Sequence, residues 1–208
     1  RTLISQATSI QSAIADLLQR AASQVASGRL MAEGDGSAAQ LFLQVLATDP
    51  DNESATQGLL QITTTVIAQT RQLLEQGAIG SAQAMLDLAE AEGLNATPIA
   101  SMREQIDSEI TRRRQIAVGL EQASVLFDQG FITAPVGNNA VALLRGVLQL
   151  DPGNEQANTL LGQCANRLAQ VAAQAREADM LIQARAYLAL ALSIRPDVEQ
   201  WQAWEQTW

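Results

Sequence analysis

Apolar residues recur every three or four positions in four long segments of the chain, which is the spacing of one face of an α-helix. In residues 53–76 this face carries Leu59, Ile62, Val66, Leu73 and Leu74. In residues 155–180 it carries Leu161, Ala165, Leu168, Ala172 and Ala175. The pattern predicts long amphipathic helices over residues 3–27, 53–76, 98–128 and 155–180.

Four shorter segments share a second pattern, in which an alanine is followed four positions later by a large apolar residue. The segments are residues 37–50, 81–94, 139–152 and 183–196, with Ala38, Ala82, Ala140 and Ala184 paired with Phe42, Leu86, Leu144 and Leu188. The small residue lets a neighbouring helix approach closely, while the large one fills the groove beside it. Each segment therefore predicts a short helix of about three turns.

Polar residues and prolines mark the expected ends of these helices. Asparagine and serine favour the N-cap position because their side chains accept a hydrogen bond from the first helical turn, and proline interrupts a helix. The predicted N-caps are Ser37, Ser81 and Asn139 for three short helices, and Asn52 and Asn154 for two long ones, while Pro50, Pro152 and Pro196 end three of the short helices.

The chain also repeats itself. The stretch DPDNESA at residues 49–55 recurs as DPGNEQA at residues 151–157, which is 102 positions later, and the register continues on both sides without a gap. A repeat of this kind indicates stacked copies of one supersecondary unit. We therefore expect an all-α protein with two four-helix copies, residues 1–102 and 103–208. They would form one continuous array of about eight helices plus a C-terminal capping helix.

The short helices resemble those of tetratricopeptide repeats (TPRs). The residues that carry the resemblance are Gly77 with Ala82, Leu86 and Ala89; Ala38, Phe42 and Pro50; Ala140, Leu144 and Pro152; and Ala184, Leu188, Ala191 and Pro196. Their spacing exceeds the family period of about 34 residues, because the long helices and two loops are lengthened. The resemblance implies a TPR-like array of helical hairpins, an α-solenoid, that presents a concave face to a protein or peptide.

The two long loops, residues 29–37 and 131–138, occupy equivalent places in the two copies. Loops on a rigid scaffold often carry binding residues, although these loops are also placed to cover helix ends. They look like loops in TPR-like segments of bacterial envelope proteins, so the resemblance favours a periplasmic or other extracytoplasmic location. Because the chain starts with Arg1 rather than Met, a signal or membrane anchor further upstream is an open alternative.

The formal net charge of −9 argues against nucleic acid as a partner, since nucleic-acid binding needs a basic face. It argues equally against broad attachment to anionic lipid. The basic run Arg112-Arg113-Arg114 points in three directions if it is helical, which favours a solvated, salt-bridged surface there over a contact with an anionic partner. No apolar run approaches the ~18 residues that a membrane span needs.

Candidate catalytic chemistry is sparse. The chain has no histidine, which removes the commonest general base and the catalytic triads built on it. Cys164 has no second cysteine to pair with, and its place on an apolar stripe favours a small buried hydrophobe. Asp49, Asp51 and Glu53 lack the turn glycine and terminal glutamate of a calcium loop. We expect no enzyme activity, no cofactor and no metal site.

The expected function is a non-catalytic protein–protein interaction scaffold within a bacterial cell-envelope assembly. The polar faces of the long helices would line the partner groove through Gln57, Gln61, Thr64, Asn158, Asn166 and Gln170. Trp201, Trp204 and Trp208 form one stripe with Ile194 and Val198 if the tail is helical, and they either cap the last helices or anchor a partner. The alternatives are an oligomerisation or spacer module whose tryptophan tail docks into another subunit, and a peptide- or glycan-binding envelope module.

Overall fold

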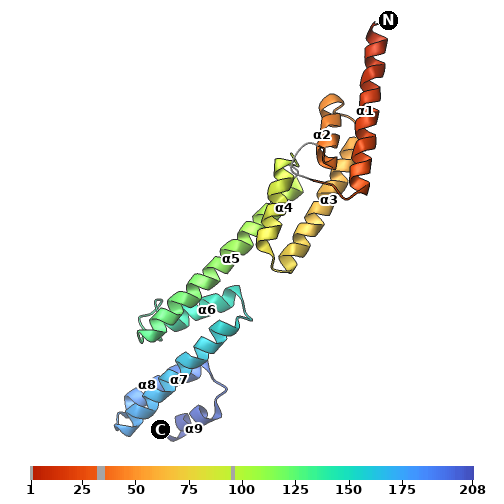
Figure 1. The fold of residues 1–208 in the computed structure, drawn as a ribbon. Coiled ribbons are helices and arrows are strands. Elements are labelled where there is room, and N and C mark those ends of the chain that lie inside the picture. The colour runs from red at the N-terminus through yellow and green to blue at the C-terminus, as the bar shows by residue number, and fades with distance from the viewer. Residues whose placement is uncertain (1, 32–35, 95–96) are drawn as a thin grey trace. The chain divides into compact units, whose positions relative to one another are not determined.

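The computed structural model describes residues 2–31, 36–94 and 97–208, and these residues contain nine α-helices and no strand (Figure 1). The prediction of an all-α protein is confirmed. The helices are α1 (Thr2–Ala26), α2 (Ala38–Thr48), α3 (Glu53–Glu75), α4 (Ile79–Ala91), α5 (Thr97–Asp128), α6 (Ala140–Leu150), α7 (Glu155–Glu177), α8 (Leu181–Ile194) and α9 (Glu199–Thr207). Long and short helices therefore alternate from α1 to α8.

Four of the five predicted N-caps are confirmed. The side chain of each accepts a hydrogen bond from the backbone N–H three positions later, which satisfies one of the unpaired donors of the first turn. The donors are Gln40 for Ser37 (3.1 Å), Ala55 for Asn52 (3.1 Å), Ala142 for Asn139 (2.8 Å) and Ala157 for Asn154 (2.9 Å).

The prediction that Ser81 is the N-cap of α4 is wrong. Helix α4 begins at Ile79, so Ser81 lies inside it, and Ala78 stands at the capping position without a side-chain hydrogen bond. The reason lies in the preceding turn, where Gly77 takes a left-handed backbone conformation with a φ of 76°. This conformation ends α3 and reverses the chain within three residues, and α4 then begins before Ser81 is reached.

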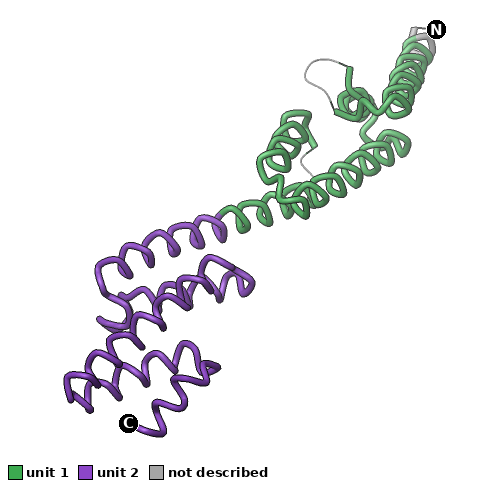
Figure 2. Tube along the Cα trace, turned by 60° about the horizontal axis from the view of Figure 1, so that its bottom comes forward, with its two compact units in different colours: residues 1–110 green, residues 111–208 purple. Residues whose placement is uncertain are grey.

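The chain divides into two compact units, residues 1–110 and 111–208 (Figure 2). The boundary lies inside α5, the helix that also contains the expected boundary after residue 102. In the first unit α1 to α4 are closed by the start of α5, whose Ile99, Met102 and Ile106 are buried in the core. Helix α5 therefore completes one unit and begins the next.

Helix α9 has the same role in the second unit that the start of α5 has in the first. Trp201 is buried in the core of the second unit, and Trp204 and Trp208 pack against that core. The three tryptophans stand 102 positions after Ile99, Met102 and Ile106, so α9 continues the register of the repeat. Each unit thus consists of long, short, long and short helices followed by a covering helix.

The two matching seven-residue stretches form the same turn. The backbone N–H of Asp49 donates to the carbonyl of Val45, and that of Asp151 donates to Val147, both at 2.8 Å. The side-chain amide of Asn52 donates to the Asp49 carboxylate at 3.0 Å, and Asn154 donates to Asp151 at the same distance. The repeated sequence therefore ends one helix and caps the next in each unit.

One contact between a short and a long helix is built differently in the two units. In the first unit the Phe42 ring of α2 lies against Gly58 of α3, so closely that a Cβ atom at Gly58 would come within 2.4 Å of the ring. The equivalent positions in the second unit are Leu144 and Leu160. The first unit thus pairs a large aromatic ring with a glycine, where the second unit pairs two leucines.

We predict that Gly58→Ala destabilises the protein by about 1 to 2 kcal/mol in urea unfolding. The added methyl group must displace the buried Phe42 ring, and this cost exceeds the gain of about 1 kcal/mol in helix propensity. Gly80→Ala in α4 is the matched control, because a Cβ atom there meets nothing within 4 Å, and it should stabilise. Phe42→Leu in the Gly58→Ala background should recover part of the loss. Equal effects of the two alanine substitutions would contradict this packing.

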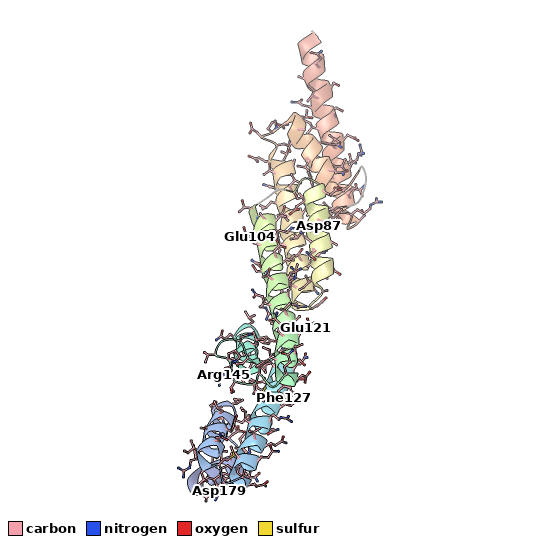
Figure 3. The ribbon with its side chains drawn as sticks, turned by 90° about the vertical axis from the view of Figure 1, so that its left-hand side faces the viewer. Asp87, Glu104, Glu121, Phe127, Arg145 and Asp179 are labelled. Atoms are coloured by element: carbon pink, nitrogen blue, oxygen red, sulfur yellow. The ribbon has the colours of Figure 1, made fainter. Side chains whose placement is uncertain are left out.

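A second difference concerns the turn between α7 and α8, where Asp179 lies (Figure 3). Asp179 has a φ of 60°, a left-handed conformation that in the first unit is taken by Gly77 at the equivalent position. We predict that Asp179→Gly raises stability by up to about 1 kcal/mol, because it relieves the left-handed strain and removes a negative charge from the end of α7. Thermal unfolding would measure it, and the reciprocal Gly77→Asp should destabilise. A lower melting temperature for Asp179→Gly would contradict the prediction.

Candidate functional site

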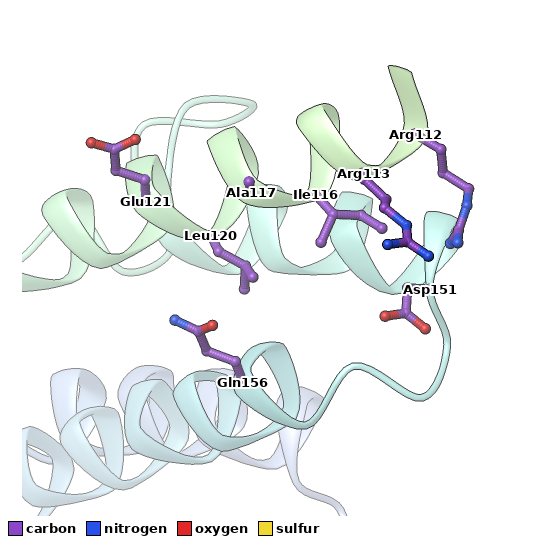
Figure 4. A pocket seen from close by; sticks show the side chains of 8 residues that line it. All are labelled: Arg112, Arg113, Ile116, Ala117, Leu120, Glu121, Asp151 and Gln156. Atoms are coloured by element: carbon purple, nitrogen blue, oxygen red, sulfur yellow. The ribbon is translucent and has the colours of Figure 1, made fainter. Parts of the chain in front are cut away.

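A groove lies between α5 and the start of α7, entirely within the second unit (Figure 4). Its cavity measures about 560 Å³, and the apolar residues Ile116, Ala117 and Leu120 of α5 line it. Leu120 points toward α7, and Gln156 points back from α7 toward α5. The groove therefore has one apolar wall and one polar wall.

A second cavity of about 490 Å³ continues the groove along the two helices. Ser124 of α5 and Thr159, Leu160 and Gln163 of α7 line it, and Gln156 lines both cavities. Leu160 adds to the apolar surface, while the other side chains can donate and accept hydrogen bonds. The arrangement suits a segment of polypeptide, whose apolar side chains and polar backbone need both kinds of contact.

Charged residues stand at both ends of the first cavity. Arg112 and Arg113 lie beside Asp151 at one end, and Glu121 lies at the other (Figure 4). The Arg112 guanidinium donates to the carbonyl of Leu150 at 2.9 Å, which satisfies a carbonyl at the end of α6. Arg112 is thus held in place by the end of the neighbouring helix.

The residues expected on the partner face are all exposed on their helices. On α7 the positions 159, 163, 166 and 170 follow helical spacing, so Asn166 and Gln170 extend the row of groove residues Thr159 and Gln163. Asn158 is also exposed, but it precedes Thr159 directly and points about 100° away from it. It therefore does not belong to this row.

Thr159 and Gln163 are groove residues that reasoning from the sequence missed. The signal was present, because these residues stand 102 positions after Gln57 and Gln61, which the sequence singled out in the first copy. The third residue chosen there, Thr64, corresponds to Asn166. The repeat of 102 residues therefore relates the three residues of the first copy to Thr159, Gln163 and Asn166 of α7.

The tryptophan tail packs on its own unit. Trp201 is only 6% exposed, and the rings of Trp204 and Trp208 are stacked with centroids 4.9 Å apart. Arg185 of α8 donates a hydrogen bond to the backbone oxygen of Trp208. This packing accords with the capping hypothesis, and the docking of these tryptophans to a partner stays a prediction.

The residues from Ile194 to Trp208 do not form the single stripe on one helix that a helical tail would give. Helix α8 ends at Ile194 and α9 begins only at Glu199, so the stripe is divided between two helices and the turn that joins them. Pro196 lies in this turn and does not continue α8. Proline has no backbone N–H to donate a helical hydrogen bond, and its ring clashes with the preceding turn. Ile194 and Val198 still pack on the same core as the tryptophans.

The two long loops are anchored in different ways. At the end of the first loop, Ser37 donates to the carboxylate of Glu92 at the end of α4, and the side chain of Gln40 donates to the same carboxylate at 3.1 Å. In the second loop, Asn139 donates to the carbonyls of Thr133 and Pro135 at 3.2 and 2.8 Å. Residues 32–35 of the first loop lie outside the described residues.

Little reactive chemistry accompanies the groove. Cys164 is fully buried, and burial raises the pKa of its thiol to about 11. Among residues 2–31, 36–94 and 97–208, no group of three or more cysteines and carboxylates is placed to hold a metal ion. No helix within these ranges is long and apolar enough to cross a membrane.

Comparisons with protein-family models, with curated proteins and with solved structures find no match to this chain. The resemblance to TPRs therefore stands on the residues that carry it in the sequence.

We predict that Cys164 of the native protein does not react with a thiol reagent such as 5,5′-dithiobis(2-nitrobenzoate) at neutral pH. The buried thiol stays protonated, and only the thiolate is nucleophilic. Full reaction is expected in urea. A Ser124→Cys variant provides an exposed thiol in the groove as a positive control, and labelling of native Cys164 at the rate of this control would contradict the assignment.

Proposed function

We propose that the chain is a divergent TPR-like, non-catalytic scaffold that binds a protein or peptide in the groove between α5 and α7. The observation that carries the proposal is the continuous groove itself, with an apolar wall from Ile116 to Leu120 and a polar wall from Gln156 to Gln163. The resemblance to TPRs implies a partner site on the long helices, and the groove lies between two of them.

The lining favours a polypeptide over a small metabolite. The groove is open and elongated, and it runs along two helices instead of enclosing one compact volume. Side-chain amides such as Gln156 and Gln163 pair with backbone N–H and C=O groups, which every peptide carries. The charges of Arg113 and Asp151 at one end of the groove would select the orientation of the bound segment more than they raise its affinity.

The absence of histidine and the burial of Cys164 support a non-catalytic role. The proposed place of the protein in a bacterial cell-envelope assembly is supported only by the likeness of its two loops. The alternative, a spacer or oligomerisation module that docks its tryptophan tail into another subunit, is less favoured. Trp201 is already buried within its own unit, so docking through it would expose that core.

Site-specific photocrosslinking tests the groove. We predict that benzoylphenylalanine in place of Gln163 forms a discrete adduct with a partner in cells of the native source. The same amino acid in place of Gln183, which is exposed on α8, should form none. Ala117→Arg, at an exposed position in the groove, should abolish the Gln163 adduct by filling the cavity while leaving the helical circular dichroism unchanged.

The outcome that contradicts the proposal is an adduct at Gln183 alone, or a Gln163 adduct that survives Ala117→Arg. Alanine substitution of Asn166 and Gln170 extends the test along the same face of α7. If these residues contact the partner, their loss should weaken the adduct.

A further inference from the structure

A second groove lies between α5 and α6, and it is separate from the groove between α5 and α7. Its two cavities measure about 450 and 470 Å³, and Val118, Gln122 and Leu143 line both. Two valines of α5 that line it are exposed to solvent, Val118 by 44% and Val125 by 49%. Of the residues around this groove, Glu121 alone also lines the groove that faces α7.

The first unit provides an internal control for this surface. At the positions of Val118, Gln122 and Val125, helix α1 carries Asp16, Arg20 and Ser23. Asp16 and Arg20 form an ion pair at 3.7 Å on the exposed side of α1. The same exposed face is thus polar in one copy of the repeat and apolar in the other.

The short helices show the same difference. On α6 the groove is lined by Ala142, Gly146 and Leu150, where α2 has Gln40, Gln44 and Thr48. Leu143 is only partly buried, whereas its counterpart Leu41 is 1% exposed. Contiguous exposed apolar surface is uncommon on proteins that have no partner there. The differences between the two copies therefore leave an exposed apolar surface on α5 and α6 of the second unit.

We propose that a second copy of this chain packs against this face, with the two α5 helices antiparallel about a twofold axis near Val118. The charges on α5 are the reason for choosing a second copy as the partner. Arg114 and Glu121 stand on the same side of the helix as Val118, two turns apart, which is about 10 Å. When a second α5 runs in the opposite direction, each Arg114 lies opposite the Glu121 of the other copy.

This charge pattern is self-complementary, as a twofold interface requires. In the part of the chain that the structure describes, neither Arg114 nor Glu121 has an ion-pair partner. The Glu121 side chain points away from α7 (Figure 4), and Figure 3 marks it on α5, together with Arg145 on α6. Each copy would thus supply the opposite charge that the other lacks.

Small residues make close approach of the two copies feasible. Ala142 and Gly146 line the hollow between α5 and α6, and a Cβ atom at Gly146 would meet nothing within 4 Å, so an apolar side chain of the second copy can enter there. The paired surface is limited to one helix and the groove beside it. We therefore expect a reversible dimer with an affinity typical of small interfaces, and not a permanent one.

Sedimentation velocity of the full chain over micromolar to submillimolar concentrations tests the proposal. The wild type should pass reversibly from monomer to dimer. Val118→Asp, which installs the residue found at the equivalent place in α1, should weaken dimerisation by about tenfold or more, since it desolvates a charge at the centre of the interface. Ile182→Asp is the matched control, because Ile182 on α8 is 87% exposed and lies outside this surface, and it should change nothing.

Charge reversal tests the antiparallel geometry separately. Arg114→Glu and Glu121→Arg should each weaken the homodimer, because like charges then face each other at both ends of the interface. An equimolar mixture of the two variants should dimerise again, since every facing pair is once more opposite in charge. Circular dichroism confirms that each variant remains folded.

Three results would overturn the proposal. The first is a wild type that remains monomeric over the whole concentration range. The second is a dimer that Val118→Asp leaves intact, which would place the contact on another surface. The third is a mixture of the two charge variants that associates no better than either variant alone. These measurements follow self-association of the isolated chain and involve no other partner. They therefore stand apart from the proposed function, although Glu121 also lines the groove between α5 and α7.

Discussion

A pair consisting of a long and a short helix leaves one apolar face uncovered, and the next helix in the chain must bury it. The rest of the structure depends on this constraint, because neither helix of a pair can form a core alone. The first four helices are closed by the start of α5 through Ile99, Met102 and Ile106. The remaining turns of α5 then serve as the first long helix of the second unit. This double use explains why α5 is the longest helix that the structure describes.

The second unit meets the same constraint with larger side chains. Helix α9 spans only nine residues, and it places tryptophans where α5 has isoleucine and methionine. A tryptophan buries more apolar area than either residue, so a short helix can cover the end of α7 and α8. The cluster of tryptophans at one end of the chain thus has a structural explanation, whatever else those residues contact.

Comparison of the two copies separates what the fold requires from what it does not. The turns at Asp49 and Asp151 keep the same hydrogen bonds at the same distances, so these residues serve the fold. Thr70 and Ala172 occupy equivalent buried positions. The Thr70 hydroxyl has no hydrogen-bond partner among the described residues, so the fold does not require it. Residues that differ on the surface, such as Asp16 and Val118, are the ones to examine for function.

The sequence predicted the helices and most of their caps because these features depend on neighbouring residues. Periodicity reports helices directly, and Asn52 and Asn154 cap them through contacts only three residues away. Ser81 was misassigned because the left-handed turn at Gly77 decided where α4 begins. Asn158 was chosen in place of Thr159 because the face of a helix that meets a groove depends on tertiary packing. The grooves themselves could not be predicted, since they arise from the fit of α5 against α6 and α7.

The central claim is that the last pair of helices in each unit depends on the helix that follows it. Native-state hydrogen exchange of Trp201→Ala tests this claim most directly, because it shows which helices lose protection when the packing of α9 is weakened. If α9 closes the second unit, the loss of this buried ring should cost about 3 to 5 kcal/mol of protection. The loss should spread over the amides of α7 and α8, while those of α1 to α4 keep their wild-type exchange rates. Unchanged protection of α8 would contradict the claim that each last pair of helices depends on the helix that follows it.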